Sequence, residues 1–158
     1  MKSENNKKQR RPPSGEEAAY LDLLRTCDLL ARGAAQVLKK EDLSGTQYNV
    51  LRILRGSPEG LPCGEIASRM ITRDPDITRL LDRLEKRGLI SRSREIKDRR
   101  MVITRITPEG LKVLAGLDEP VREMHRRQLG HLKKDRLAAL GELLASVREG
   151  AGNFAGNG

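Results

Sequence analysis

The sequence predicts a mainly α-helical chain that carries one small β-hairpin. Apolar residues recur at helical spacing in six stretches. Two short β-like runs flank a charged tip at residues 96–100. Proline, glycine and helix-capping residues separate these stretches from one another. The length of 158 residues fits one domain.

Three helices are predicted in the first half of the chain. The first covers residues 16–40, where leucines recur at near-helical spacing without an interrupting proline. The second begins at the N-cap Ser44, and Gln47 completes its capping box. A very short extended piece at 61–62 precedes a third helix over residues 64–70.

A fourth helix is predicted over residues 74–88, with two chemically different faces. We expect Asp74 as its N-cap and Pro75 at its first position, where a missing N–H costs nothing. Leucines form its apolar stripe, and the opposite face carries Arg79 and other charged residues. Gly88 suits the left-handed position that ends a helix.

A β-hairpin and two long helices are predicted next. The hairpin strands are expected over residues 89–95 and 101–107, on either side of the charged tip. Thr107 caps a fifth helix over residues 108–130, which starts with a proline. A sixth helix covers residues 135–149.

The surplus positive charge is concentrated in one part of the chain. Lys and Arg number 31 against 22 Asp and Glu, which gives a formal net charge of +9. Residues 69–105 alone hold twelve basic and six acidic side chains. Residues 1–15 are predicted to form a disordered basic arm. A localised basic block is typical of phosphate-backbone binding, whereas charge that serves only solubility would be spread more evenly.

Composition argues against several classes of protein. Aromatic residues make up 2% of the chain, too few for base-stacking surfaces. There is no run of about 20 apolar residues and no apolar signal-peptide region, so we expect a cytoplasmic protein. Two cysteines and two histidines do not make a metal site, and no cofactor is expected. The sequence contains no nucleophile–base pattern and no phosphate loop, so we do not expect an enzyme.

The order of the central elements is typical of a winged helix-turn-helix. Two helices joined by a short turn are followed directly by the hairpin, or wing. The basic face of helix 74–88 can enter the DNA major groove, which is roughly 12 Å wide. The wing, residues 91–105, can reach the flanking minor groove, where arginine is favoured. Residues 43–107 are therefore predicted to be the DNA-binding core.

The sequence resembles the MarR family of bacterial winged-helix regulators over about residues 16–149. The motifs that carry the resemblance are "LSGTQYNVLRIL" at 43–54, "GEIASRM" at 64–70, "DITRLLDRLEKRGLISR" at 76–92, "DRR" at 98–100 and "ITPEGL" at 106–111. The family pattern near the wing is Asp-x-Arg, then an apolar-Thr pair, then Gly. This chain supplies it with Asp98 and Arg100, then Ile106 and Thr107, then Gly110.

The resemblance implies a homodimeric transcriptional regulator on a pseudo-palindromic operator, with repression released by a small ligand. It assigns residues 16–42 and 108–149 to a helical dimerisation region. The glycines of residues 150–158 themselves predict a flexible tail. The residues themselves agree, since the long leucine-rich helices outside the DNA-binding core need a partner for their apolar faces.

Nine residues are predicted to contact DNA. Arg79 is the strongest candidate for a base contact because arginine bonds bidentately to guanine. In the alternative, Asp76, Asp82 or Glu85 holds it in an ion pair. The resemblance implies that Asp98 orients an arginine and that a wing arginine enters the minor groove. The full set is Arg73, Thr78, Arg79, Arg83, Arg94, Lys97, Asp98, Arg99 and Arg100.

Two further kinds of site are suggested by the resemblance. Family members commonly take an anionic or aromatic molecule between their dimerisation and DNA-binding parts. Arg52, Arg55 and His125 could neutralise an acid there, although each also suits an ordinary surface position. Some members sense oxidants through a thiol in the first helix. Cys27 lies in that helix, about two turns too close to the second helix to match, and Cys63 begins the third helix, where thiols become more reactive. Both cysteines also suit small buried positions.

Two alternative functions follow from these observations. One is a thiol-based, redox-responsive regulator. The other is an architectural winged-helix protein without sequence preference, which sequence-independent binding with a steep salt dependence would support. The presence of Arg79 and of the Asp98–Arg100 motif favours sequence readout over the second alternative.

Overall fold

The computed structural model describes residues 12–96 and 98–155. Within them the fold is mainly helical with one small sheet, which confirms the predicted class. The elements in chain order are α1 (Gly15–Leu38), η1 (Lys39–Glu41), α2 (Gly45–Arg55), β1 (Leu61–Pro62), α3 (Cys63–Arg69), α4 (Ile77–Lys86), β2 (Ile90–Arg94), β3 (Val102–Ile106), α5 (Pro108–Leu129) and α6 (Lys134–Ala155).

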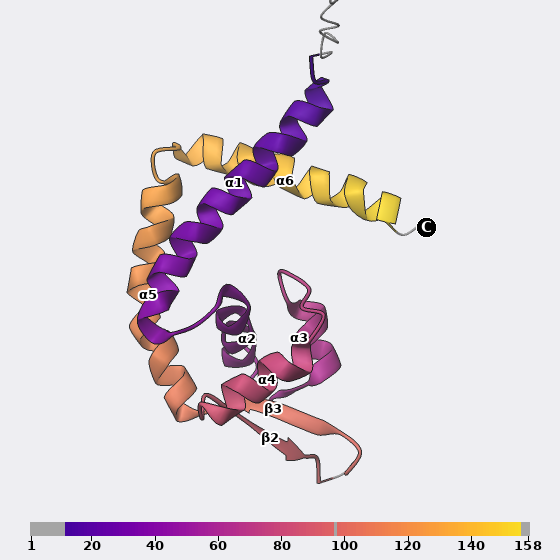
Figure 1. Cartoon of the computed structure of the whole chain (residues 1–158), viewed down its shortest axis with the longest axis vertical. Helices are drawn as coiled ribbons and strands as arrows, with labels where there is room; N and C mark the ends of the chain where they lie inside the picture. The colour runs from indigo at the N-terminus through magenta and orange to yellow at the C-terminus, as the bar shows by residue number, and fades with distance from the viewer. Residues whose placement is uncertain (1–11, 97, 156–158) are drawn as a thin grey trace, which may run out of the picture.

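The helices divide into a central group and a peripheral group (Figure 1). Helices α2, α3 and α4 gather on the sheet, and the β2–β3 hairpin projects from this group at the lower right of the view. Helices α1 and α5 lie side by side along one flank. Helix α6 turns away from α5 at the end of the molecule opposite the hairpin. Helices α1 and α5 also contact α2, so the central and peripheral groups share one core, and the predicted division of the chain at residues 43 and 107 stays a prediction.

The sheet has three antiparallel strands in the order β1-β3-β2. In the hairpin Ile90 faces Ile106 and Arg92 faces Thr104, so the two strands are paired along their whole length. The two-residue strand β1 adds to the outer edge of β3, with Leu61 opposite Thr104. The short extended piece predicted at 61–62 is therefore the third strand, and it anchors the wing to the helical core.

The hydrophobic core lies between the central helices, the sheet and the inner face of α5. Fully burying a Leu or Ile side chain contributes about 1.5–3 kcal/mol, so the packing of these side chains holds the elements together. The most buried apolar side chains are Val50, Leu51, Leu54, Ile66, Leu81, Leu84, Ile90, Leu114 and Leu117.

Helix starts follow the predicted capping chemistry with one exception. The Ser44–Gln47 capping box is present, and the Thr107 side chain accepts the Gly110 N–H with Pro108 at the first position of α5. The prediction of Asp74 as the cap of α4 is wrong. The carboxylate of Asp76 accepts the Arg79 N–H at 3.2 Å and is the true N-cap.

Helix α4 is consequently shorter than the predicted 74–88. The Asp74 carboxylate accepts the Asp76 N–H at 2.8 Å, which makes a side-chain turn before the helix, and Pro75 lies within that turn. At the other end the prediction for Gly88 is confirmed, since its φ of 71° is the left-handed conformation that glycine adopts without strain.

The first and last helices also differ from their predicted bounds. Helix α1 ends at Leu38 and continues as the 3₁₀ turn η1, after which Asp42 adopts a left-handed φ of 49°. Helix α6 runs on to Ala155, through most of the predicted flexible tail. Each glycine there costs only about 1 kcal/mol of helix propensity, and no proline follows to stop the helix. Residues 1–11 of the predicted arm lie outside the described residues. Among the helices described, none is long and apolar enough to span a membrane.

Candidate nucleic-acid interface

The turn between α3 and α4 is held by a side chain of α2. The Asn49 side-chain oxygen accepts the Ile71 N–H at 2.8 Å, which fixes where the chain leaves α3. Arg73 follows in this turn and is exposed. The turn therefore presents a cation beside the start of α4, where the sequence placed it.

The outer face of α4 is polar and accessible. Thr78, Arg79 and Arg83 are all exposed on it, while its leucines face the core. The Arg79 guanidinium stands 3.5 Å from the Asp76 carboxylate and remains 70% exposed. Such an exposed pair is worth about 0–1 kcal/mol, so Arg79 can leave it at little cost. Of the three candidate carboxylates, Asp76 is the one that Arg79 contacts.

The other two carboxylates are engaged by an arginine of the wing. Arg92 on β2 donates from Nε to Glu85 at 2.9 Å and from Nη2 to Asp82 at 2.5 Å. Its backbone N–H also donates to Glu85, at 3.1 Å. The bidentate guanidinium thus joins α4 to the wing and neutralises two acidic groups of the basic block.

The protonation equilibria reflect this network. The hydrogen bonds from Arg92 hold the pKa of Glu85 below its usual range, against a smaller opposing effect of burial. The pKa of Arg92 is raised in turn, chiefly by its hydrogen bond with Glu85. Glu85 and Arg92 are therefore both charged at neutral pH, and the link between α4 and the wing persists there.

The wing tip is shaped by Asp98. Its carboxylate accepts the Arg100 N–H at 3.0 Å, and its carbonyl accepts the Met101 N–H at 3.0 Å. The carboxylate thus holds the backbone of the turn, whereas the resemblance implied that it would orient an arginine side chain. Arg94, Arg99 and Arg100 are exposed around the tip. Lys97, also predicted to contact DNA, lies outside the described residues.

The three residues predicted for an effector cleft lie on α2 and α5, and both Arg52 and Arg55 of α2 act on the Asp118 carboxylate of α5. Arg55 on α2 donates two hydrogen bonds, of 2.9 and 3.0 Å, to Asp118 on α5. The positive charge of Arg55 is therefore already paired with the Asp118 carboxylate, and the same hydrogen bonds lower the pKa of Asp118. Arg52 lies over the Tyr48 ring, 5.8 Å from its centroid, and His125 is exposed on α5.

The cysteines are unpaired and differ in environment. Cys27 is exposed on α1, so the expectation of a small buried residue is wrong there. Cys63 is the first residue of α3, as predicted, and is partly buried against the core.

Two arginines with clear structural roles were missed by the sequence analysis. Arg92 shares the strand face of the buried Ile90, and this two-residue alternation was an available signal. Arg87 donates to the backbone carbonyls of Glu41 and Asp42 at 2.7 and 2.6 Å, which ties the end of α4 to the end of η1. No sequence pattern indicates that contact, because Arg87 lies 45 and 46 positions along the chain from the two residues that it contacts.

The geometry defines a winged helix-turn-helix, and comparison with known proteins places it in a family. The MarR family model matches residues 43–102. A crystal structure of a MarR transcription factor from Planctomyces limnophilus is 46% identical, with a TM-score of 0.66, over 85% of this chain and 98% of that one. The chain belongs to the MarR family of transcriptional regulators.

Further relatives agree with this assignment. YfiV and the transcriptional repressor MdtR, both of Bacillus subtilis, are 34% and 30% identical over 117 and 118 residues. These stretches cover 74% and 72% of this chain, and 65% and 73% of those proteins. The PcaV regulator of Streptomyces coelicolor, solved with its natural ligand, is 27% identical with a TM-score of 0.68 over 79% of this chain and 90% of that one.

Proposed function

We propose that this MarR-family protein acts as a homodimer that recognises a pseudo-palindromic DNA operator. One observation carries the proposal. The outer face of α4 and the wing both carry exposed cations, and the hydrogen bonds of Arg92 join these two elements into one unit. Helix α4 enters the major groove and the wing reaches the adjacent minor groove, as in other winged helix-turn-helix proteins. We infer that the protein works in the cytoplasm, where its DNA target lies.

Each predicted contact has a distinct role. Arg79 reads a base by bidentate bonding to guanine, after leaving its exposed pair with Asp76. Thr78 and Arg83 contact phosphates or base edges, and Arg73 contacts the backbone next to the turn. The wing adds Arg94, Lys97, Arg99 and Arg100, with Asp98 shaping the tip between them.

Exposed leucines on the long helices support the homodimer. Leu24 and Leu29 on α1 are 51% and 63% exposed, and Leu143 on α6 is 66% exposed. Helix α6 makes no extensive contact with any other described element. A second copy of the chain would cover these faces and place two recognition helices on one duplex.

We further propose that the protein represses transcription and that a small ligand releases it. The relative MdtR is a transcriptional repressor, and the PcaV structure holds a natural ligand. Release requires that the ligand bind the DNA-free conformation more tightly than the DNA-bound one. Arg52 and His125 remain candidates for neutralising an acidic ligand, whereas Arg55 is already paired with Asp118.

Selection of duplexes from a random DNA pool tests the proposed function. Purified full-length protein at near-physiological salt should enrich pseudo-palindromes whose half-sites lie about 10 bp apart, centre to centre. Binding without enrichment of any sequence would contradict the proposal and favour the architectural alternative.

The role of Arg79 is tested on the enriched duplex. Arg79→Ala should weaken specific binding by about 1–3 kcal/mol and relax the preference at one base pair of each half-site. Arg25→Ala, which removes an exposed arginine of α1, is the matched control and should leave the preference unchanged. An unaltered base preference in the Arg79 variant would exclude it as the reading residue.

A redox-responsive regulator is the second candidate, because Cys27 is exposed on a helix that we assign to the dimer interface. Peroxide should then release DNA from the wild-type protein and not from Cys27→Ser. Peroxide without effect on wild-type binding would exclude this candidate.

A further inference from the structure

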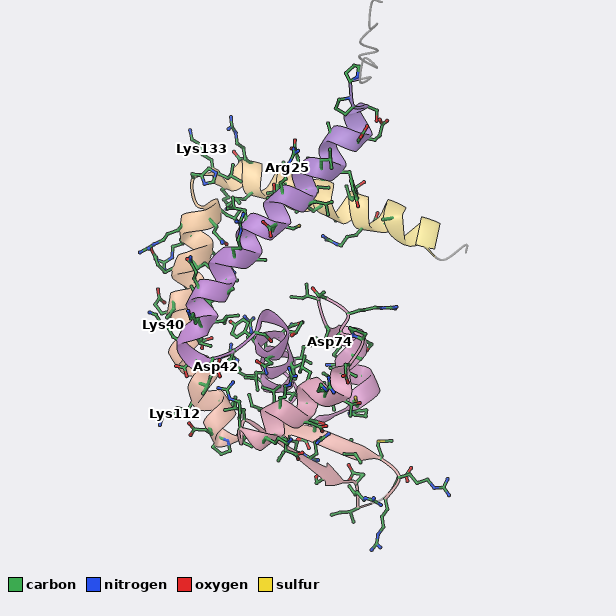
Figure 2. All side chains as sticks on the ribbon, viewed as in Figure 1. Arg25, Lys40, Asp42, Asp74, Lys112 and Lys133 are labelled. Carbon is green, nitrogen blue, oxygen red and sulfur yellow. The ribbon has the colours of Figure 1, made fainter. Side chains whose placement is uncertain are left out.

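The most exposed large apolar side chain of the described residues lies at the tip of the wing. Ile96 is 94% exposed, whereas Ile90 and Ile103 in the hairpin strands are buried. A hydrogen bond of 2.9 Å from the Glu95 N–H to the Met101 carbonyl closes the end of the hairpin, and Ile96 is the first residue beyond it. Figure 2 shows side chains that radiate from this tip into open space, away from the helices.

The backbone on both sides of Ile96 is held by short-range hydrogen bonds. The Glu95 carboxylate accepts the Ile96 N–H at 3.2 Å. Further round the tip, the Asp98 carboxylate accepts the Arg100 N–H at 3.0 Å. Both carboxylates are thus turned toward backbone donors, and the isoleucine side chain projects from a shaped turn.

Exposed arginines surround this apolar side chain. Arg94 ends β2 on one side of the tip, and Arg99 and Arg100 follow on the other side. The central contacts of a protein–protein interface are depleted in charged residues. A segment that enters a DNA groove, in contrast, needs cations beside it for the phosphates. The surroundings of Ile96 therefore favour a nucleic-acid partner over a protein partner.

We propose that Ile96 is an apolar wedge, which the wing inserts between two base pairs from the minor groove and which bends the duplex. This inference rests on the proposed function, in which the wing reaches that groove. Apolar side chains inserted in this way kink the duplex by about 20–90° toward the major groove. Pyrimidine–purine steps unstack most easily, so we expect a TA or CA step at each wing tip.

The free energy of the insertion has two opposing parts. Insertion removes from water an apolar surface that the free protein exposes almost completely. It costs the unstacking of one base step for each wing. The neighbouring arginines would bind phosphates on either side of the opened step and hold the tip there.

The test uses the full chain and three variants. Ile96→Ala shortens the wedge, and Ile96→Leu keeps its volume. Ile71→Ala is the matched control, because Ile71 is 89% exposed in the turn before α4. The control keeps the hydrogen bond to the Asn49 side chain, which the backbone N–H of Ile71 donates.

The first measurement is energy transfer between dyes at the two ends of a duplex taken from the bound fraction of the random pool. A duplex of about 40 bp is well below the persistence length of about 150 bp, so the free duplex is nearly straight. The wild type, Ile96→Leu and the control should bring the two ends together to the same extent. Ile96→Ala should produce less than half of that change in energy transfer.

The second measurement is the salt dependence of binding to the same duplex. Ile96→Ala removes three carbon atoms from each wing tip but also spares part of the unstacking, so we expect affinity to fall by about tenfold. The slope of log K against log salt should equal that of the wild type, because the arginines keep their phosphates. A shallower slope would mean that the substitution displaced the arginines, and it would overturn the role of Ile96 as a wedge.

The remaining outcomes separate this inference from the function on which it rests. A straight duplex in the wild-type complex would overturn the wedge alone, as would an unchanged bend with Ile96→Ala or an equal loss of bend in the control. If Ile96→Ala alters only the sedimentation of the free protein, the tip is a protein contact and the wedge is excluded. If the wild type binds no duplex, the proposed function and the wedge both fail.

Discussion

Replacing Arg92 with glutamine should damage both stability and DNA binding. The Arg92 side chain is 25% exposed, and its carboxylate partners Asp82 and Glu85 are 44% and 37% exposed. A hydrogen bond to a charged group contributes about 1.5–3 kcal/mol, whereas a fully exposed ion pair contributes about 0–1 kcal/mol. This partly buried network lies between those limits, so we expect a loss of about 2 kcal/mol. For a chain of this size the Tm should fall by about 4–8 °C at fixed protein concentration.

The effect on DNA binding has a separate cause. Without Arg92, the carboxylates of Asp82 and Glu85 are uncompensated beside the face that meets phosphates, and the wing loses its link to α4. We expect DNA affinity to fall about tenfold, which corresponds to about 1.4 kcal/mol. Adding Glu85→Gln to the variant should recover part of this affinity, because one of the repelling charges is removed.

Urea unfolding and fluorescence anisotropy with a labelled duplex measure the two effects. Arg92→Lys is the control, since it keeps the charge but lacks the fork that bridges two carboxylates. It should fall between the wild type and Arg92→Gln in both assays. A glutamine variant that unfolds within 0.5 kcal/mol of the wild type, on the order of an ordinary surface substitution, would refute the reasoning.

Three further predictions follow from other contacts. Arg55→Met breaks the pair with Asp118, whose groups are 32% and 40% exposed, and should cost about 1 kcal/mol in urea unfolding; no change would show that the pair contributes nothing to the α2–α5 contact. Acidification should destabilise the fold, because the pKa values of Glu85 and Asp118 lie below their ordinary values of 4.5 and 3.8. Their contribution is complete above those values and is lost as the pH falls through the lowered folded values. When the pH is lowered below about 4.5, the urea concentration at the unfolding midpoint should therefore fall, and it should fall less steeply with pH in Asp118→Asn. Equal pH slopes for the wild type and this variant would contradict the contribution assigned to Asp118. Gly110→Ala should cost about 2 kcal/mol or more, because a Cβ there would clash with the Leu89 carbonyl oxygen. Gly116→Ala in the same helix meets open space and should be neutral or stabilising. Equal unfolding midpoints for the two alanine variants would exclude a steric role for Gly110.

Local chemistry explains which parts of the fold the sequence predicted well. The caps at Ser44 and Thr107 use hydrogen bonds to residues three positions away, so the pattern along the chain is sufficient. At α4 the sequence offered Asp74 and Asp76 with a proline between them. Both carboxylates accept a nearby N–H, and the backbone geometry alone decides which of them caps the helix.

Contacts between distant elements were beyond sequence reasoning. The helical pattern put Arg55 on α2 correctly, but its partner Asp118 lies 63 positions later on another helix. The bonds from Arg87 to the carbonyls after α1 likewise depend on how α4 lies against that end. The arginines among the candidate DNA-contacting residues were therefore predictable as exposed cations, whereas the links that hold their elements in place required the structure.

Footprinting of the wild-type protein on its selected duplex tests the central claim most directly. Methylation protection reports guanine N7 in the major groove, and hydroxyl radicals report the minor groove. We predict two patches of protected guanines about 10 bp apart, each flanked by a protected stretch of minor groove. The Arg79→Ala variant should lose guanine protection and keep the flanking minor-groove protection. A single patch, or protection without any phase along the duplex, would contradict recognition by two helix-and-wing units.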